Sequence, residues 1–258
     1  MHGVADLKPD AVYGTALLIV AAGLAYLALR GGFWWLLLWP CASFLLLSLA
    51  YFRGSVHVFG KGENGERSPL LGALLSAFIL FGRLVWELQT RFSRESPWHA
   101  VGKCLVVSRR LRPQELPEDV SVVVDLTSEF LDPRCIRSLP GYRCIPILDA
   151  NALTPDALAD HVRRIGVPLD GRLLIHCANG HGRAGLVAAA WLIGQGLAGS
   201  PKEALDLLQS VRPRVRLRRC QRESLAVASC LLASSTNREH ASERWIGGGV
   251  HNRSVASE

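Results

Sequence analysis

The chain has 258 residues, a formal net charge of +7 and a hydrophobic fraction of 49%. This length allows one or two domains, and the hydrophobic fraction is high for a protein that lies wholly in water. The seven cysteines form no C-x-x-C pair and no zinc-type spacing. That scatter argues against a disulfide framework and against a structural zinc site, and it suits free thiols in a reducing compartment.

The excess of hydrophobic residues lies near the N-terminus. Residues 11–29 carry no charged side chain, and neither do residues 31–52. Each stretch is long enough to cross about 30 Å of hydrocarbon. The tight turn between them, at Arg30, predicts a transmembrane helical hairpin within residues 1–53. Amphipathic rings that suit membrane interfaces stand at the two ends of the second stretch: Trp34, Trp35 and Trp39 at one and Tyr51 at the other.

The alternative to a hairpin is a cleaved signal peptide followed by a buried core helix. The first stretch is longer than the apolar region of a signal peptide and lacks a clear cleavage site. A third apolar stretch, residues 69–82, ends at Arg83 and is short for a membrane span. Segment 54–97 is therefore expected to hold a loop and an interfacial or half-inserted helix, or one packed on the hairpin. A third crossing stays open.

Basic residues flank the apolar stretches, among them Arg53, Lys61 and Arg67. If basic flanks stay in the cytoplasm, a two-span hairpin places both chain ends there. The prediction is a protein of the inner or plasma membrane whose globular part faces the cytoplasm. Beside a membrane hairpin, the positive net charge indicates attraction to anionic lipid rather than binding of nucleic acid.

Residues 98–233 alternate short runs rich in Val, Ile and Leu with helical patterns, which predicts an α/β layer domain. Strands are expected at 103–107, 121–125, 142–147 and 172–176, and helices at 154–165, 183–193, 200–211 and 220–233. Thr154 and Ser200, each followed by proline, are typical helix N-caps. The polar, glycine-bearing residues 234–258 are predicted to form a disordered tail.

The stretch HCANGHGR joins the last predicted strand to the strongly apolar helix at 183–193. Backbone amides of such a loop can converge with the helix N-terminus to form a nest for an anion. Gly180 and Gly182 allow the backbone conformations that this needs. Arg183 adds a planar fork for two phosphate oxygens. Cys177 would then lie at the floor of a positive cradle, where the nucleophilic thiolate is favoured.

The spacing of cysteine and arginine is a weak signal by itself. Cys104 and Arg110 have the same spacing, but no glycine lies between them and Cys104 begins inside an apolar strand. The alternative for Cys177 is a buried structural cysteine in an ordinary strand-to-helix turn. The strand before it, the glycines within the loop and the helix after it favour a reactive cysteine.

The loop resembles the phosphate-binding loop of the cysteine-dependent protein tyrosine and dual-specificity phosphatase superfamily. The resemblance runs from about Trp98 to Leu232. Within the superfamily, the chain resembles bacterial membrane-anchored members of dual-specificity type. It rests on the loop, on VDLT at 124–127, on IPILD at 145–149, and on Arg212-Pro213 with Gln221. It implies a protein tyrosine phosphatase-like domain with a central sheet flanked by helices. The implied phosphate-binding residues are Ala178, Asn179, Gly180, His181, Gly182 and Arg183.

The resemblance also implies a role for each matching residue. Cys177 would attack phosphorus and form a phosphocysteine, while Arg183 would hold the equatorial oxygens. His176 would orient the loop and help to hold the thiolate without touching the substrate. This chemistry needs no metal ion and no other cofactor.

The leaving alcohol needs a proton from a carboxylic acid on a separate loop. Asp149 is the predicted acid, because it follows a strand end at the family's general-acid position. The alternative for Asp149 is a turn or helix-capping role. Asp125 is the second candidate for the acid, although the family uses its position structurally, and Asp132 is a weaker one.

Two loop features affect the expected activity. The family usually has Ser or Thr after the loop arginine, whereas this chain has Ala184. The missing hydroxyl would hydrogen-bond the departing sulfur, so a loss of turnover from a few-fold to about a hundredfold is expected. His181 either faces the substrate entrance and tunes selectivity or is a plain solvent-facing histidine.

The sequence thus predicts a membrane-anchored phosphatase whose substrate is either a phosphoprotein or a phospholipid monoester. The loop lacks the lysines of phosphatases specific for polyphosphorylated inositols, which makes a highly charged headgroup less attractive. Ala184 suggests the alternative of a catalytically weak phosphate-binding membrane anchor. A rhodanese-like sulfur transferase also uses a loop cysteine, but the pattern from His176 to Arg183 speaks against it.

Overall fold

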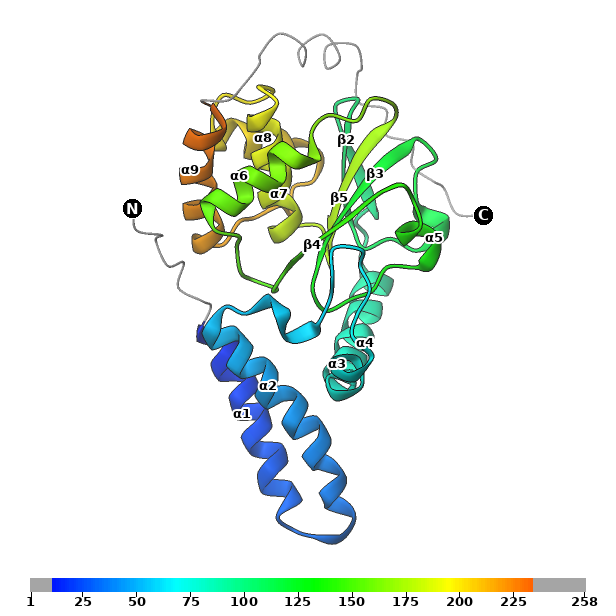
Figure 1. Ribbon diagram of the computed structural model, residues 1–258, viewed down its shortest axis with the longest axis vertical. Helices are drawn as coiled ribbons and strands as arrows, with labels where there is room; N and C mark the ends of the chain where they lie inside the picture. Colours follow the sequence, from blue (N-terminus) through cyan, green and yellow to red (C-terminus); the bar gives the residue numbers. More distant parts are fainter. Residues whose placement is uncertain (1–10, 234–258) are drawn as a thin grey trace.

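The structure is a computed structural model that describes residues 11–233. The predicted tail, residues 234–258, lies outside the described residues. Two long helices, α1 and α2, project from an α/β domain (Figure 1). Two further helices, α3 and α4, lie beside α2 and extend towards the domain.

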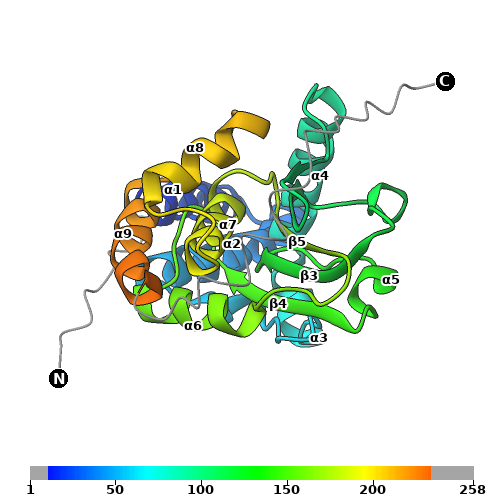
Figure 2. The same cartoon turned by 90° about the horizontal axis from the view of Figure 1, so that it is seen from above.

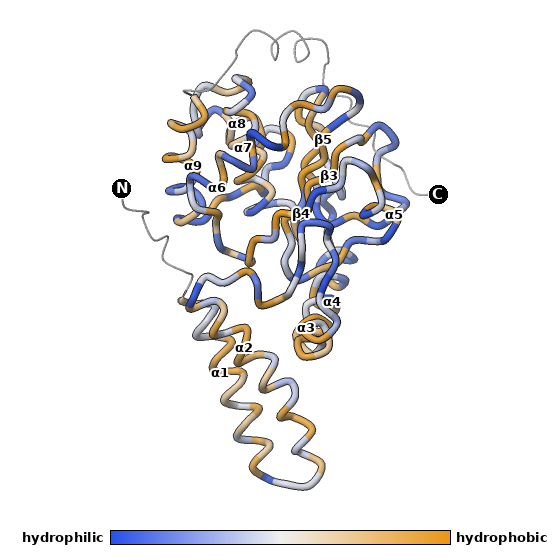
Figure 3. The backbone as a smooth tube through the Cα atoms, in the orientation of Figure 1, coloured by the Kyte–Doolittle hydropathy of each residue, from blue (hydrophilic) through white to orange (hydrophobic). Residues whose placement is uncertain are grey.

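The projecting helices form the apolar hairpin that the sequence predicted. α1 spans Ala11–Ala28 and α2 spans Leu38–Arg53, with a 3₁₀ turn at Gly32–Leu37 between them. Both are mostly hydrophobic along their length (Figure 3). By length and composition, α1 and the segment Gly32–Arg53, which comprises the 3₁₀ turn and α2, could each cross a membrane. The helices approach closely at Gly14, where a Cβ would lie 3.0 Å from the Phe52 ring.

The third apolar stretch forms two helices that pack on the hairpin. After a 3₁₀ turn at Val56–Phe59, α3 spans Pro69–Leu74 and α4 spans Ser76–Phe92. The Phe44 ring of α2 makes edge contacts with Phe78 and Phe81 of α4, with centroids 5.8 and 6.3 Å apart. Phe44 is about 13 Å from Arg53 along the helix axis at 1.5 Å per residue. The start of α4 therefore lies well down the side of the hairpin.

The α/β domain is built on a five-stranded sheet in the order β1-β2-β5-β3-β4. The strands are β1 Trp98–Val101, β2 Leu105–Arg109, β3 Val120–Thr127, β4 Gly141–Ile147 and β5 Arg172–Cys177. β1 pairs antiparallel with β2, and all other neighbours are parallel. The four predicted strands are confirmed, and β1 is an edge strand that the sequence patterns did not indicate.

Helices cover the sheet from two sides (Figures 1 and 2). One group comprises α6 Pro155–Ile165, α7 Gly182–Gly194, α8 Pro201–Val211 and α9 Arg219–Ala233, while the short α5, Arg134–Arg137, lies on the other side. A 3₁₀ turn at Pro113–Glu115 follows β2. The Thr154 and Ser200 hydroxyls accept hydrogen bonds from the first turns of α6 and α8, as the sequence predicted.

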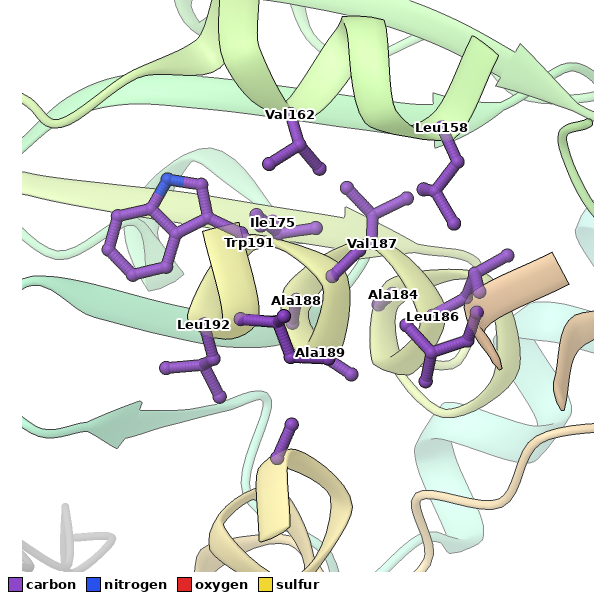
Figure 4. Close-up of a cluster of buried hydrophobic side chains, with 14 of the residues drawn as sticks. Leu158, Val162, Ile175, Ala184, Leu186, Val187, Ala188, Ala189, Trp191 and Leu192 are labelled. Atoms are coloured by element: carbon purple, nitrogen blue, oxygen red, sulfur yellow. The ribbon is translucent and has the colours of Figure 1, made fainter. Parts of the chain in front are cut away.

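Helix α7 lies at the centre of the larger core. All its residues from Arg183 to Ile193 are buried. Figure 4 shows Val187 and Trp191 of this helix among side chains from the sheet and the neighbouring helices. A helix that is apolar on every side suits this position. The burial fixes the N-terminus of α7, and with it the end of the glycine-rich loop.

The parallel strands end at one edge of the sheet, where ligands of open α/β sheets usually bind. β5 lies between β2 and β3 in the sheet. Cys177, the last residue of β5, is therefore at the middle of this edge, between Arg109 at the end of β2 and Thr127 at the end of β3.

The loop between the hairpin and α3 places a charge inside the α/β domain. Lys61 Nζ is fully buried and donates to Asp125 Oδ2 at 2.6 Å and to the carbonyls of Thr127 and Phe130 at 2.7 and 2.5 Å. Burial by itself would raise the pKa of Asp125. The Lys61 ammonium, together with His176, instead lowers that pKa below its usual value. Segment 54–97 thus contributes a side chain to the interior of the domain that follows it.

Lys61→Met should destabilise the full-length protein by about 3–5 kcal/mol, because Asp125 would keep a buried charge without its partner. Chemical unfolding in detergent micelles, followed by tryptophan fluorescence, measures the change in free energy. The control is Lys202→Met in the exposed first turn of α8, where a change within about 0.5 kcal/mol is expected. Equally small effects of both substitutions would contradict the structural role of Lys61.

Candidate active site

Cys177 lies where the chain leaves β5 and enters the loop before α7. The residue is 3% exposed, and its Sγ accepts a hydrogen bond from the Gly180 amide at 3.2 Å. An N–H group aimed at a sulfur stabilises negative charge on it. The structure therefore folds the predicted loop back over the predicted nucleophile.

The three carbonyls that follow Cys177 point out of the loop. They belong to Ala178, Asn179 and Gly180. The first accepts a hydrogen bond from Trp86 Nε1 at 2.9 Å, and the other two accept from Arg212 at 3.1 and 2.9 Å. A peptide unit whose carbonyl points outward presents its N–H to the opposite side. The loop amides are thereby turned inward, which is the arrangement of an anion nest.

Glycine is required at position 180 for two reasons. Its φ of 73° lies in the left-handed region, which other residues rarely adopt. In addition, a Cβ would lie 2.6 Å from the backbone of Ser108 and Arg109. Gly182 is less constrained, since a Cβ there would meet the Gln221 side chain at 3.2 Å.

Arg183 is fully buried at the start of α7. Its Nη1 and Nη2 donate to the Glu129 carboxylate at 2.9 and 2.7 Å, and Nη1 also donates to the Ile147 carbonyl at 2.9 Å. Burial alone would lower the pKa of Arg183, but Glu129 and Asp149 raise it well above the usual value. The Nε–H group is buried and has no partner among the described residues. Arg183 is thus a permanent cation whose Nε–H is not accepted by any group in the described part of the chain.

Asp149 lies beside Arg183 on the loop that follows β4. Its Oδ1 is 3.1 Å from Arg183 Nη2, and its side chain is 56% exposed. The next residue, Ala150, has a φ of 64°, which costs a non-glycine residue about 1 kcal/mol. The preceding residue, Leu148, is buried in the apolar cluster that contains Tyr51 of the hairpin. The structure therefore brings Asp149 to the same place as Arg183, on a loop that packs against the hairpin.

A family model described as "Swiss Army Knife protein, DSP-PTPase phosphatase domain" matches residues 112–239, a range that includes the loop, Arg183 and Asp149. The chain belongs to the dual-specificity phosphatase superfamily. It is accordingly a phosphoric monoester hydrolase, and the resemblance found in the loop motif is confirmed. No curated protein matches the chain.

Several solved phosphatase structures are similar to this phosphatase. PTPMT1 in complex with PI(5)P is 18% identical, with 54% of this chain and 97% of that chain covered and a TM-score of 0.44. Tk-PTP in its active form is 28% identical, with coverages of 54% and 97% and a TM-score of 0.43. Human DUSP28 is 19% identical, with coverages of 54% and 96% and a TM-score of 0.42.

His176, just before the loop cysteine of the phosphatase, belongs to a buried ion-pair network. Its Nε2 lies 2.9 Å from Asp132 Oδ2. Burial opposes the protonated form, but Asp132 and Asp125 together raise the pKa of His176 above its usual value. These three residues lie close enough together to be metal ligands. However, Lys61 and Arg110 already supply positive charge to the two carboxylates, so the cluster fits an ion-pair network better than a metal site.

The same network distinguishes the three candidates for the general acid. Asp125 and Asp132 are 0% and 4% exposed and are paired inside the phosphatase. Asp149 alone of the three presents an exposed carboxylate beside Arg183. The geometry thus favours Asp149 over the two alternatives that the sequence left open.

Helix α4 and the segment after it contact the catalytic loop. His181 Nε2 lies 2.7 Å from Glu95 Oε2, and Glu95 also lies 3.4 Å from Arg212. Asn179 Nδ2 donates to Gln89 of α4 at 3.2 Å. His181 is therefore paired and partly covered, so it is not a plain solvent-facing histidine, while its role at the substrate entrance stays a prediction. Burial lowers the pKa of His181 below its usual value, although Glu95 opposes this effect.

Sequence reasoning missed several residues of the site. Trp86, Glu95 and Glu129 each contact the loop or Arg183 from another part of the chain. Glu129 could have been recognised as a candidate, because it is an acidic residue shortly after the end of a predicted strand, at the sheet edge where the loop was expected. For Trp86 and Glu95 no local pattern existed. Ala184 is fully buried in the first turn of α7, and Cys104 lies in the turn between β1 and β2, away from the loop.

Gly180→Ala should lower kcat/KM for an aryl phosphate by about a hundredfold or more, because relief of the clash with Ser108 and Arg109 must displace the loop amides. Hydrolysis of p-nitrophenyl phosphate by the full-length protein measures the loss. Gly166→Ala is the matched control, since Gly166 also has a positive φ of 63° but a Cβ there meets nothing within 4 Å. If the two variants had equal activity, the loop backbone would not depend on glycine as argued.

Proposed function

We propose that this phosphatase is anchored in a membrane and hydrolyses phosphate monoesters through a phosphocysteine formed on Cys177, without a metal ion. Its substrate is a phosphoprotein or a phospholipid monoester. One observation carries the proposal: the buried Nε–H of Arg183 lacks a partner among the described residues, at the end of a loop whose Gly180 amide donates to Cys177 Sγ. A phosphate group supplies the oxygens that such a fork and such a nest bind.

In the first step the Cys177 thiolate attacks phosphorus in line with the leaving oxygen. A phosphorus–sulfur bond forms, and the phosphorus–oxygen bond breaks with its electron pair on the alcohol oxygen. Asp149 donates the proton that makes the leaving group a neutral alcohol. Arg183 and the loop amides balance the charge of the equatorial oxygens.

In the second step water attacks the phosphorus of the phosphocysteine. The Asp149 carboxylate accepts a proton from this water, and sulfur leaves as the thiolate. Ala184 has no hydroxyl to donate to that charge. The Gly180 amide, 3.2 Å from Sγ, is the donor in this chain that eases the departure of sulfur.

His176 is a positioning residue in this proposal. Its imidazole binds Asp132, inside the network that Lys61 completes. A side chain held in this way fixes the end of β5 and therefore the position of Cys177. His176 contributes through the geometry of its neighbour, not through contact with the substrate.

The membrane anchor follows from the apolar surface of the hairpin. Large side chains such as Ile19, Leu29 and Trp35 are 67%, 83% and 66% exposed, which is costly in water over so long a surface. At the end near the phosphatase domain, the rings of Tyr13 and Tyr51 stack at 5.7 Å, where amphipathic rings suit a membrane interface. We place the phosphatase domain on the cytoplasmic side. The basic residues that flank the hairpin are on the same side of it as the domain, and basic flanks usually stay in the cytoplasm.

Cys177→Ser should lower turnover of p-nitrophenyl phosphate by about 10³-fold or more, because the hydroxyl is a poor nucleophile without a base to activate it. Binding of vanadate should persist, since Arg183 and the loop amides are unchanged. The control is Cys104→Ser, which should retain activity. Normal turnover by Cys177→Ser would overturn the phosphocysteine mechanism, and loss of activity in a folded Cys104→Ser protein would mean that the wrong cysteine was chosen.

Asp149→Asn should slow the hydrolysis of alkyl phosphates by about 10²–10⁴-fold and that of activated aryl phosphates far less, because only a poor leaving group needs the proton. A general acid must be protonated to act, so activity on alkyl phosphates should fall as pH rises. That alkaline limb should vanish in Asp149→Asn. Steady-state rates for both substrate classes across the pH range test this, and equal slowing of the two would indicate a positioning role instead.

A further inference from the structure

A cavity of about 620 Å³ lies between the hairpin, α4 and the catalytic loop. Such a volume is typical of small-molecule sites. We call it the hairpin groove. Its apolar walls come from Tyr13, Leu17 and Val20 of α1, Phe44 of α2, and Phe81 and Val85 of α4.

The hairpin groove has one polar end, and that end is the candidate active site. Asp149, Ala178 and Asn179 line it there. Ala178 and Asn179 directly follow Cys177, and Asp149 contacts Arg183. A molecule in the groove would therefore place one end beside the nucleophile and the general acid.

The rest of the groove extends along the hairpin, away from the active site. Tyr13, Leu17 and Val20 follow one another at one-turn spacing on α1, which covers about 10 Å of helix axis. The groove thus joins a phosphate-binding end to an elongated apolar channel beside helices that we propose to lie in the bilayer.

We propose that the substrate is a membrane lipid phosphomonoester whose acyl chain occupies the hairpin groove while its phosphate lies over Cys177. This inference rests on the function proposed above and narrows it to the lipid alternative. An acyl chain fits the groove because it needs no hydrogen-bond partners along its length. A peptide in the same place would leave backbone N–H and C=O groups without partners.

The exposed face of α4 agrees with access from the bilayer. Its apolar side chains recur every four residues and stay exposed: Leu80 60%, Leu84 60%, Leu88 47% and Phe92 78%. A helix that runs from the side of the hairpin towards the domain with such an exposed apolar stripe, and with Arg83 and Arg91 beside it, suits contact with the bilayer and its interface. The groove wall formed by α4 would then lie at the depth where a lipid headgroup meets its chains.

Trp86 contacts both the hairpin groove and the loop that follows Cys177. Its indole lines the groove, and its Nε1 donates to the Ala178 carbonyl at 2.9 Å. A chain lying in the groove would touch the side chain that holds the catalytic loop. The groove is for this reason part of the active site and not a separate lipid-binding surface.

A series of monoalkyl phosphates from butyl to dodecyl tests the proposal, with the full-length protein in phosphatidylcholine nanodiscs and phosphate release as readout. Since burial of one methylene is worth about 0.8 kcal/mol, kcat/KM should rise by up to about fourfold per methylene until the groove is filled. Gly82→Leu places a side chain in the groove, where a Cβ would meet only the Phe130 ring, at 3.9 Å. It should lower the dodecyl-to-butyl ratio of kcat/KM at least about tenfold.

Gly23→Leu is the matched control, because Gly23 is an exposed glycine of α1 where a Cβ meets nothing within 4 Å. It should leave the ratio unchanged. Partition of long chains into the nanodisc is the same for all variants, so an unchanged ratio in Gly82→Leu would overturn the proposal. A phosphotyrosine peptide hydrolysed with a higher kcat/KM than dodecyl phosphate would overturn it as well and would indicate a phosphoprotein substrate.

Different results would overturn the proposed function and the lipid inference. Absence of hydrolysis for every substrate, including p-nitrophenyl phosphate, would overturn the proposed function and the lipid inference together. Hydrolysis of p-nitrophenyl phosphate without dependence on chain length would overturn only the lipid inference. Binding of dodecyl phosphate to Cys177→Ser, followed by isothermal titration calorimetry and compared with the Cys177→Ser, Gly82→Leu double variant, gives a readout that does not depend on turnover. Equal binding by both would also count against the groove.

Discussion

The chemistry of the Cys177 loop depends on the direction in which its peptide units face. An anion nest needs several amides on one side, so the matching carbonyls must be satisfied on the other side. Arg212 and Trp86, from two distant parts of the chain, donate hydrogen bonds to these carbonyls. Arg212 is itself buried, and Glu95 balances its charge. The conformation of the loop is thus held by side chains that lie outside it.

Buried charge also fixes the contact between the segment that follows the hairpin and the phosphatase domain. Lys61 enters the α/β domain and pairs with Asp125, while Arg67 donates to the carbonyls of Ser128 and Glu129. The Glu129 carboxylate in turn holds Arg183. Such contacts are costly to break once formed, because each would leave a buried charge unpaired. They fix the loop that joins the hairpin to α3 against the phosphatase domain, which supports the proposed groove between the hairpin, α4 and the Cys177 loop.

The parts of this protein that were predictable from sequence are those with a local pattern. The apolar hairpin, the strand before Cys177, the glycines of the loop and the apolar helix α7 each carry their signal within a few residues. β1 escaped notice because its four residues include His99 and are too few to show alternation. The donors to the loop carbonyls escaped for another reason. Trp86 is far from Ala178 in sequence, and a tryptophan on an amphipathic helix does not reveal which buried carbonyl it will reach.

The contact between Asp149 and Arg183 connects the resting geometry to the proposed reaction. Arg183 Nη2 is shared between Glu129 at 2.7 Å and Asp149 at 3.1 Å, whereas Nε has no partner within residues 11–233. A phosphate binding along the Nε–Nη2 edge would compete with Asp149 but not with Glu129, whose two oxygens hold both terminal nitrogens. The arriving phosphate would thus release the one carboxylate that is exposed and keep the one that is buried. Release from Arg183 would leave the Asp149 side chain free to turn towards the leaving oxygen, which is where a general acid must lie.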